Sequence, residues 1–184
     1  IRILLQKTST KGLKNTMLQN KAQKIKLVAT DIDGVWTDSK MYYTNEGVFM
    51  KSFSTYDGMG ASLLLKNSFI VSMITSEYEN IEILLKRAEK LNISEVFTHE
   101  KDKLSRLKYL VEKYNLKPEN VAYIGDDLND LEAMKYVGLS SAPPNSPILD
   151  YYNPDFITKR ESGSGSFRDL AELIMNAQNI NVVF

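Results

Sequence analysis

The chain of 184 residues contains no cysteine, one histidine and one tryptophan. Without cysteine it can form neither a disulfide nor a thiolate metal site, and this composition is consistent with a reducing cytoplasm. Its 23 basic side chains are balanced by 23 acidic ones, so no net charge attracts nucleic acid or an anionic membrane. The longest apolar runs, such as residues 69–74, are too short to cross a bilayer, and no signal-peptide pattern is visible. We therefore expect a cytoplasmic protein that binds neither nucleic acid nor membrane.

The length suits one domain with a substantial core, but the composition changes along the chain. Residues 6–24 are rich in Lys, Thr, Asn and Gln and contain few apolar residues. We expect residues 1–24 to form a solvated N-terminal extension or a linker to an upstream domain. The folded domain is expected over residues 25–177, followed by a C-terminal tail over residues 178–184.

Apolar runs alternate with amphipathic segments within residues 25–177. Strands are expected at residues 25–30, 69–75, 96–97 and 121–124, and helices at 57–66, 79–91, 102–114, 128–136 and 167–177. Asp57 is the expected N-cap of the first of these helices. Two aromatic-rich runs around an Asn-Glu-Gly turn, residues 41–44 and 48–53, indicate a β-hairpin. Strands alternating with helices of this length predict an α/β fold with a mostly parallel sheet.

Acidic side chains follow two of the expected strands. Asp31 and Asp33 come directly after the first strand, in an Asp-Ile-Asp-Gly segment, and Asp126 follows the strand at 121–124. Alternation along a strand sends Asp31 and Asp33 to the same side, and the carboxyl ends of parallel strands meet at one edge of the sheet. Clustered carboxylates need a cation or a proton between them, and Mg²⁺ prefers oxygen ligands. We predict Asp31, Asp126 and the backbone carbonyl of Asp33 as its ligands.

A hydroxyl and a lysine complete the expected site. Thr75 ends the second apolar strand, where its hydroxyl can donate to a phosphate oxygen, and Lys103 lies near the start of a helix. A metal, a lysine and backbone amides together would stabilise charge on a transferring phosphoryl group. Taken singly, these residues have ordinary explanations as a helix cap, a surface lysine and, for Asp127 and Asp130, acids of a first helical turn. Their occurrence together favours phosphoryl transfer.

These segments together resemble the four motifs of the haloacid dehalogenase superfamily of phosphohydrolases, over roughly residues 24–177. The resemblance implies a Rossmann-like three-layer α/β sandwich. It also implies that Asp31 is the nucleophile that forms an aspartyl-phosphate and that Asp33 is the general acid and base. By the same resemblance Asp31, Asp33 and Asp126 hold Mg²⁺, Thr75 and Lys103 bind the phosphoryl group, and Asp127 and Asp130 support the metal and Lys103.

A narrower resemblance covers the segment from Gly34 through the hairpin to Gly58, together with residues 121–127 and 163–168. These segments are similar to the small capless phosphatases of 2-keto-3-deoxy sugar acid phosphates. That group has a β-hairpin flap and no inserted cap domain. It forms homotetramers in which a neighbouring subunit closes the active site. The substrate-binding residues that this resemblance implies are Asp57, Gly58, Glu77, Arg87, Lys90 and Arg168.

The second motif bears on which sugar acid is the substrate. Octulosonate 8-phosphate phosphatases of lipopolysaccharide synthesis usually carry Thr-Gly-Arg there, whereas this chain has Thr75-Ser76-Glu77. A glutamate is similar to the nononate 9-phosphate enzymes, in which it contacts the sugar, so we expect that substrate first and octulosonate 8-phosphate as the alternative. Ser76 in place of glycine, and two extra residues before Arg87, depart from the pattern.

Two other functions stay open from the sequence. One is a non-catalytic oligomerisation domain attached to a sugar-acid cytidylyltransferase, although such domains tend to lose motif acids that are retained here. The other is a phosphotransferase or a broad phosphatase with the same machinery. Trp36 either forms a wall of the pocket or packs at the base of the hairpin, and His99 is expected to have no catalytic role.

Overall fold

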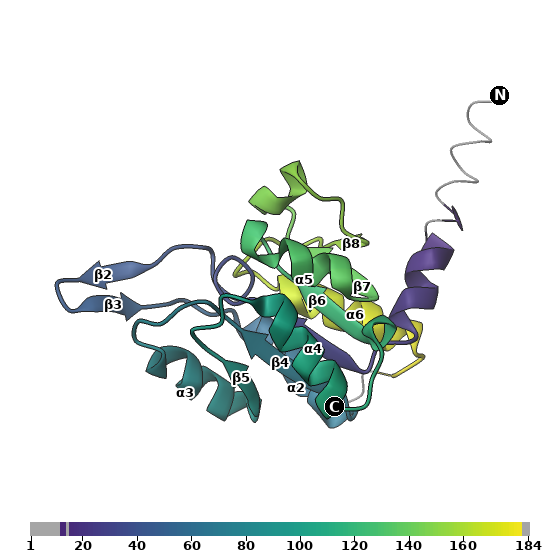
Figure 1. Cartoon of the computed structure of the whole chain (residues 1–184), viewed down its shortest axis with the longest axis horizontal. Helices are drawn as coiled ribbons and strands as arrows, with labels where there is room; N and C mark the ends of the chain where they lie inside the picture. The colour runs from purple at the N-terminus through teal and green to yellow at the C-terminus, as the bar shows by residue number, and fades with distance from the viewer. Residues whose placement is uncertain (1–11, 14, 182–184) are drawn as a thin grey trace.

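A computed structural model describes residues 12, 13 and 15–181 of the chain. Its centre is a six-stranded sheet in the order β5-β4-β1-β6-β7-β8, and every pair of neighbouring strands is parallel (Figure 1). The strands are β1 (Leu27–Thr30), β4 (Ile70–Ile74), β5 (Glu95–Phe97), β6 (Val121–Ile124), β7 (Leu139–Ala142) and β8 (Phe156–Ile157). The chain runs from β1 outward through β4 and β5, then returns to β6 on the other side of β1. This reversal places a crevice beyond the carboxyl ends of β1 and β6, where ligands bind in such sheets.

Helices cover both faces of the sheet, which confirms the three-layer α/β fold. Alternation along β1 explains how two cores form, because Val28 points into one face while Leu27 and Ala29 point into the other. The first core packs under α2 (Thr55–Lys66), α3 (Glu82–Leu91) and α6 (Ser166–Ala177), and the second under α4 (Lys103–Lys113) and α5 (Leu131–Tyr136). Within the described residues no helix is both long enough and apolar enough to span a membrane.

The predicted hairpin is present and projects beyond the sheet (Figure 1). Strand β2 (Tyr42–Thr44) pairs antiparallel with β3 (Gly47–Met50), and all of β2 is exposed. This hairpin, with its connecting loops, is all that lies between β1 and α2, so no cap domain is inserted there. The prediction of a capless fold is therefore confirmed.

The two ends of the chain contact the domain over part of their length. Residues 15–22 are helical, Ala22 is buried in the first core, and Lys21 pairs with Asp155 at 2.5 Å. The Gln178 side chain donates to the carbonyl oxygens of Ala22 and Ile25. Residues 1–11, 14 and 182–184 lie outside the described residues, so the division of the chain at residues 24 and 177 stays a prediction.

Several element boundaries differ from those expected. Ser54 is the N-cap of α2, and its hydroxyl accepts from the Tyr56 amide, so the prediction of Asp57 as the cap is wrong. The helix expected at 79–91 begins only at Glu82, and the one expected at 128–136 opens with the 3₁₀ turn η2 (Leu128–Asp130). Two further 3₁₀ turns are η1 (Pro118–Asn120) and η3 (Pro147–Asp150).

Trp36 packs in the core against Phe167, with ring centroids 4.8 Å apart, and is not exposed to any pocket.

Candidate active site

A cavity of about 660 Å³ lies at the carboxyl edge of the sheet. The register places Thr30 beside Met73 of β4 and Ile124 of β6, so the loops after these three strands begin at the same level. These loops supply most of the lining, and Ser39 and Met41 complete it from the segment before the hairpin. Among the predicted site residues, those that line the cavity are Asp31, Asp33, Thr75, Glu77, Asp126 and Asp127.

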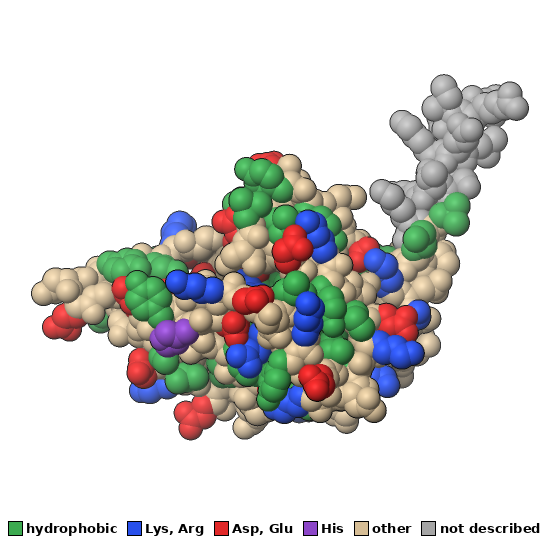
Figure 2. All heavy atoms as spheres, viewed as in Figure 1, with side chains coloured by type: hydrophobic (Ala, Val, Ile, Leu, Met, Phe, Trp, Pro, Cys, Tyr) green, Lys and Arg blue, Asp and Glu red, His purple; other side chains and the backbone are tan. Residues whose placement is uncertain are grey.

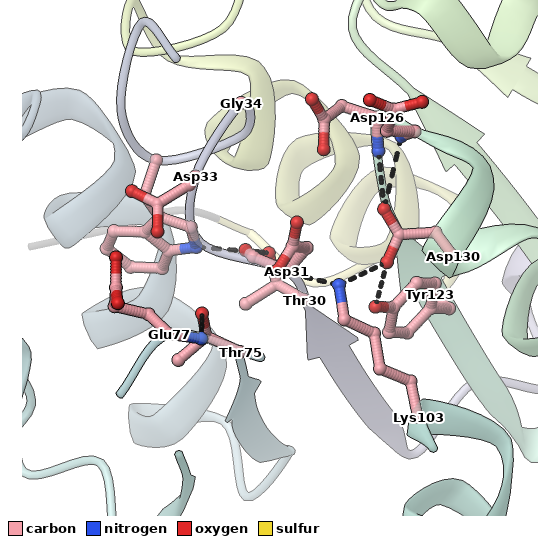
Figure 3. A network of polar contacts seen from close by, with 12 residues as sticks. Thr30, Asp31, Asp33, Gly34, Thr75, Glu77, Lys103, Tyr123, Asp126 and Asp130 are labelled. Carbon is pink, nitrogen blue, oxygen red and sulfur yellow. Dashed lines mark hydrogen bonds and ion pairs between the residues drawn. The ribbon is translucent and has the colours of Figure 1, made fainter. Parts of the chain in front are cut away.

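Three buried carboxylates meet beside this cavity (Figure 3). Asp31, Asp126 and Asp130 each offer an oxygen within 4.8 Å of the other two. Burial raises the pKa of the Asp31 carboxyl, and the charge of Asp130 adds to the effect. Burial likewise raises the pKa of Asp126, with repulsion from Asp31 and Asp130 acting in the same direction. Ionised carboxylates repel one another when they lie this close together. The cluster therefore suits a hard divalent cation, which takes oxygen ligands and neutralises their charge.

Both carboxylate oxygens of Asp130 accept hydrogen bonds from other groups of the protein. Its Oδ1 accepts from the Lys103 ammonium at 2.6 Å and from the Tyr123 hydroxyl at 2.6 Å. Its Oδ2 accepts from the backbone amides of Asp126 and Asp127. With both oxygens satisfied, Asp130 fixes Lys103 and the loop after β6, and this leaves Asp31 and Asp126 as the carboxylates free to hold a metal.

Lys103 is the buried positive charge of the site. Its side chain is only 1% exposed, and its ammonium lies 2.9 Å from Asp31 Oδ1, which places it between Asp31 and Asp130. Burial alone would lower the pKa of this ammonium, but the two carboxylates outweigh burial and raise it. Lys103 is therefore held cationic beside the cavity, at the first residue of α4.

Gly34 allows the loop after β1 to pass close to Asp126. Its φ of +96° lies in the region that favours glycine, and a Cβ at this position would lie 1.9 Å from an Asp126 carboxylate oxygen. No other residue fits this approach without displacing the Asp126 side chain. The glycine of the Asp-Ile-Asp-Gly segment thus serves the carboxylate cluster directly.

The remaining side chains of the loops are held locally. Thr75 is buried, and its Oγ1 accepts from the Glu77 amide at 3.1 Å, so its hydroxyl proton stays available for a ligand. Asp127 is exposed and caps η2, because its Oδ1 accepts from the Leu128 amide. Asp33 accepts from the Thr37 hydroxyl at 3.3 Å and from the Lys51 ammonium at 2.7 Å.

Five of the six predicted substrate-binding residues do not line the cavity of their own chain. Asp57 is buried and accepts from the Arg168 amide, so it satisfies a backbone donor in the first turn of α6. The Arg87 guanidinium donates to the Ser54 carbonyl, and a Cβ on Gly58 would lie 2.4 Å from it. The Arg168 side chain pairs with Glu172 on its own helix, and Lys90 is exposed on α3. A role for these five in substrate binding stays a prediction.

Two residues of the site were missed from the sequence. Tyr123 is fully buried in β6, and its hydroxyl donates to Asp130. A tyrosine in an apolar strand could have indicated this contact, because a buried tyrosine hydroxyl needs a polar partner. Lys51 follows β3, and its ammonium lies between Asp33 and Glu77. No local pattern marks Lys51, since its contacts come from loops distant in sequence.

The raised pKa values predict how stability depends on pH and metal. Without a cation the folded protein keeps protons on Asp31 and Asp126 that the unfolded chain releases near pH 4. The folded state then binds more protons, so the free energy of unfolding falls as pH rises above about 4. Mg²⁺ binds the ionised pair, so it should raise the melting temperature more at about pH 8 than at about pH 5. Thermal unfolding with Mg²⁺ or EDTA checks this, and equal shifts at both pH values would contradict it.

Known proteins resemble this chain in sequence and in fold. A profile of the haloacid dehalogenase-like hydrolases matches residues 5–159. The chain is 34% identical to the 3-deoxy-D-manno-octulosonate 8-phosphate phosphatase of Salmonella typhi, over 91% of this chain and 88% of that protein. The structure of such a phosphatase from Moraxella catarrhalis, in complex with magnesium, phosphate and KDO, superposes with a TM-score of 0.83 at 36% identity, over 88% of this chain and 92% of that one. A hydrolase of the same superfamily from Legionella pneumophila gives a TM-score of 0.86 at 37% identity, over 92% of each chain.

Proposed function

The chain belongs to the haloacid dehalogenase-like hydrolases and is a phosphatase, and from this premise we propose that it hydrolyses a 2-keto-3-deoxy sugar acid phosphate with Mg²⁺ as its metal. The observation that carries the proposal is the buried group of Asp31, Asp126 and Lys103 at the edge of a cavity of about 660 Å³. Lysine and carboxylates at this depth form a site for a phosphate dianion and a divalent cation together.

The chemistry proceeds in two steps on Asp31. In the first, an Asp31 carboxylate oxygen attacks phosphorus, the bond from phosphorus to the sugar oxygen breaks, and Asp33 gives its proton to that oxygen. In the second, Asp33 takes a proton from a water molecule that attacks phosphorus, and the Asp31 carboxylate leaves with inorganic phosphate as the product. Lys103 and Thr75 hold phosphoryl oxygens throughout. When bound, Mg²⁺ neutralises negative charge on the phosphoryl group and on Asp31.

Two observations bear on the identity of the sugar acid. Relatives at 34–35% identity are octulosonate 8-phosphate phosphatases, and this favours the eight-carbon substrate. Glu77 lines the cavity, and the resemblance of the second motif to the nononate 9-phosphate enzymes favours the nine-carbon substrate. Glu77 is also rigid, because its Oε1 accepts from the amides of Tyr78 and Glu79. A fixed carboxylate at the cavity wall is well placed to accept hydrogen bonds from sugar hydroxyls.

The test is phosphate release from octulosonate 8-phosphate and nononate 9-phosphate, each with Mg²⁺ and with EDTA. We expect Mg²⁺-dependent release from at least one of them in clear preference to unrelated phosphate esters. Transfer to acceptor alcohols would indicate a phosphotransferase, and equal rates on unrelated esters a broad phosphatase. Absence of release from any ester, including an aryl phosphate, would favour the non-catalytic domain.

Glu77→Ala isolates the contribution of that carboxylate to substrate choice. We expect the ratio of kcat/KM between the two sugar acid phosphates to change by about tenfold, the value of one lost hydrogen bond to a charged group. Hydrolysis of p-nitrophenyl phosphate, which has no sugar, should change less. Equal losses on all three esters would remove Glu77 from the specificity argument.

We also infer a homotetramer in which a neighbouring subunit closes the active site. The hairpin exposes apolar and aromatic side chains, among them Tyr43 at 61% and Phe49 at 69%, and Figure 2 shows hydrophobic side chains gathered on this projection. An isolated two-stranded hairpin is marginally stable in water, so contact with other subunits would both stabilise it and cover this surface. Light scattering gives the molar mass directly, and a monomer at all concentrations would refute the inference.

A further inference from the structure

One lysine of the hairpin is buried, although its neighbours in sequence are exposed. Phe49 and Met50 are 69% and 45% exposed, whereas the Lys51 side chain is only 5% exposed. Its ammonium lies 2.7 Å from Asp33 Oδ2 and 3.5 Å from Glu77 Oε2. Burying an ammonium is costly unless acceptors surround it, so this position depends on both carboxylates.

These contacts join three parts of the chain. Asp33 belongs to the loop after β1, Glu77 to the loop after β4, and Lys51 to the end of the hairpin. The other Asp33 oxygen accepts from the Thr37 hydroxyl at the longer distance of 3.3 Å, so Lys51 is the stronger of the two restraints on this carboxylate. Without Lys51, the Asp33 carboxylate would be fixed through one oxygen only.

From this geometry we propose that Lys51 is a positioning residue that holds Asp33 in place for proton transfer. The proposal rests on the proposed function, in which Asp33 donates a proton to the leaving sugar oxygen and then removes one from water. Proton transfer requires donor and acceptor within hydrogen-bond reach, and a carboxyl group free to rotate spends part of its time out of reach. Because Glu77 is held by two backbone amides, Lys51 keeps a fixed partner when Asp33 carries its proton.

The role predicts a dependence on the leaving group that a purely structural lysine would not produce. An alkyl phosphate such as a sugar acid phosphate needs a proton on its leaving oxygen, whereas p-nitrophenyl phosphate has a stable leaving group and needs little protonation. In Lys51→Met we expect kcat/KM, which reports the first step and not the later attack of water, to fall about 10- to 100-fold on the sugar acid phosphate and much less on p-nitrophenyl phosphate. The loss is smaller than the roughly 10²–10⁴-fold of general acid–base catalysis, because Asp33 is misplaced and not removed. Lys51→Arg should recover part of the loss, since it keeps a charged donor.

Two controls accompany this measurement. Lys24→Met removes an exposed lysine whose partner is Glu119 at the surface, and it should leave both activities unchanged. In an Asp33→Asn background, Lys51→Met should have little further effect on kcat/KM for the sugar acid phosphate, because the carboxylate that it positions is gone. Equal losses of kcat/KM on both esters in the single variant, or no loss on either, would overturn the proposal.

A structural measurement separates failure of this proposal from failure of the proposed function. If the wild-type protein hydrolyses no phosphate ester, the proposed function fails. The crystal structure of Lys51→Met then still decides whether Lys51 positions Asp33. We expect the Asp33 carboxylate to move or become disordered while Asp31 and Asp126 stay in place. An unchanged Asp33 in that structure would refute the positioning role.

Discussion

Replacing the proposed nucleophile with its amide, Asp31→Asn, is expected to lower turnover by at least about 10⁴-fold, as loss of a nucleophile does in other covalent enzymes. The amide has the same shape as the carboxylate, but it cannot form the bond to phosphorus. The fold should survive, because Lys103 keeps Asp130 as a partner at 2.6 Å, and repulsion between Asp31 and Asp126 disappears. Phosphate release and thermal unfolding, measured on the same preparation, check both parts.

An acid-quench experiment gives this prediction a second readout. Wild-type protein stopped during turnover should carry phosphate covalently, and Asp31→Asn should carry none. Asp150→Asn, at an exposed aspartate of η3, is the matched control and should behave as wild type. Turnover of Asp31→Asn that keeps full Mg²⁺ dependence would show that another group attacks phosphorus.

The centre of the site was predictable because local pattern and sheet geometry act together. The apolar run of β1 fixes where the strand ends, and in a parallel sheet that end lies at the same edge as the end of β6. Because β6 pairs directly with β1 in the structure, Asp31 and Asp126 converge although they are distant in sequence. Lys103 followed for the same reason, since α4 begins at the same edge.

Features that depend on contacts between distant elements could not be predicted. Asp57 resembles an N-cap of its own helix, but its carboxylate accepts from the amide of Arg168 at the start of α6. Strand β7 has two serines at its centre, and Ser140 is tolerated there because Asp155 accepts from its amide and hydroxyl. In each case the partner that makes the residue stable comes from another element, which no local pattern specifies.

The orientation of the helices explains why most of the predicted substrate-binding residues miss the cavity. The first core holds α2, α3 and α6 against one face of the sheet, so Asp57, Arg87 and Arg168 are used in contacts between and within these helices. Glu77 belongs to a strand-end loop and reaches the cavity. Proximity to a motif in sequence therefore identified Glu77 as a residue of the cavity. It does not separate residues that line the cavity from residues that hold the helices together.

Lys103→Met is expected to impair stability and turnover together. Methionine has a similar length but no charge, so Asp31 and Asp130 would stay buried without their shared cation. Removing one partner of a buried ion pair typically costs about 3–5 kcal/mol of unfolding free energy. The loss should grow as pH rises, because the pKa of the Asp31 carboxyl, already raised by burial, increases further without Lys103 and its ionised form becomes more costly to bury. Urea unfolding between about pH 5 and about pH 8 measures this.

A second variant separates the structural effect from the catalytic one. Lys103→Met combined with Asp130→Asn removes one of the two uncompensated charges, while the asparagine carbonyl can still accept from the Asp126 and Asp127 amides. We expect this double variant to regain part of the stability lost in Lys103→Met. Turnover should stay low, because the ammonium that holds the phosphoryl group beside Asp31 is gone. If turnover returned along with stability, Lys103 would act only by keeping the fold intact, and binding of the phosphoryl group would have to be assigned to other residues.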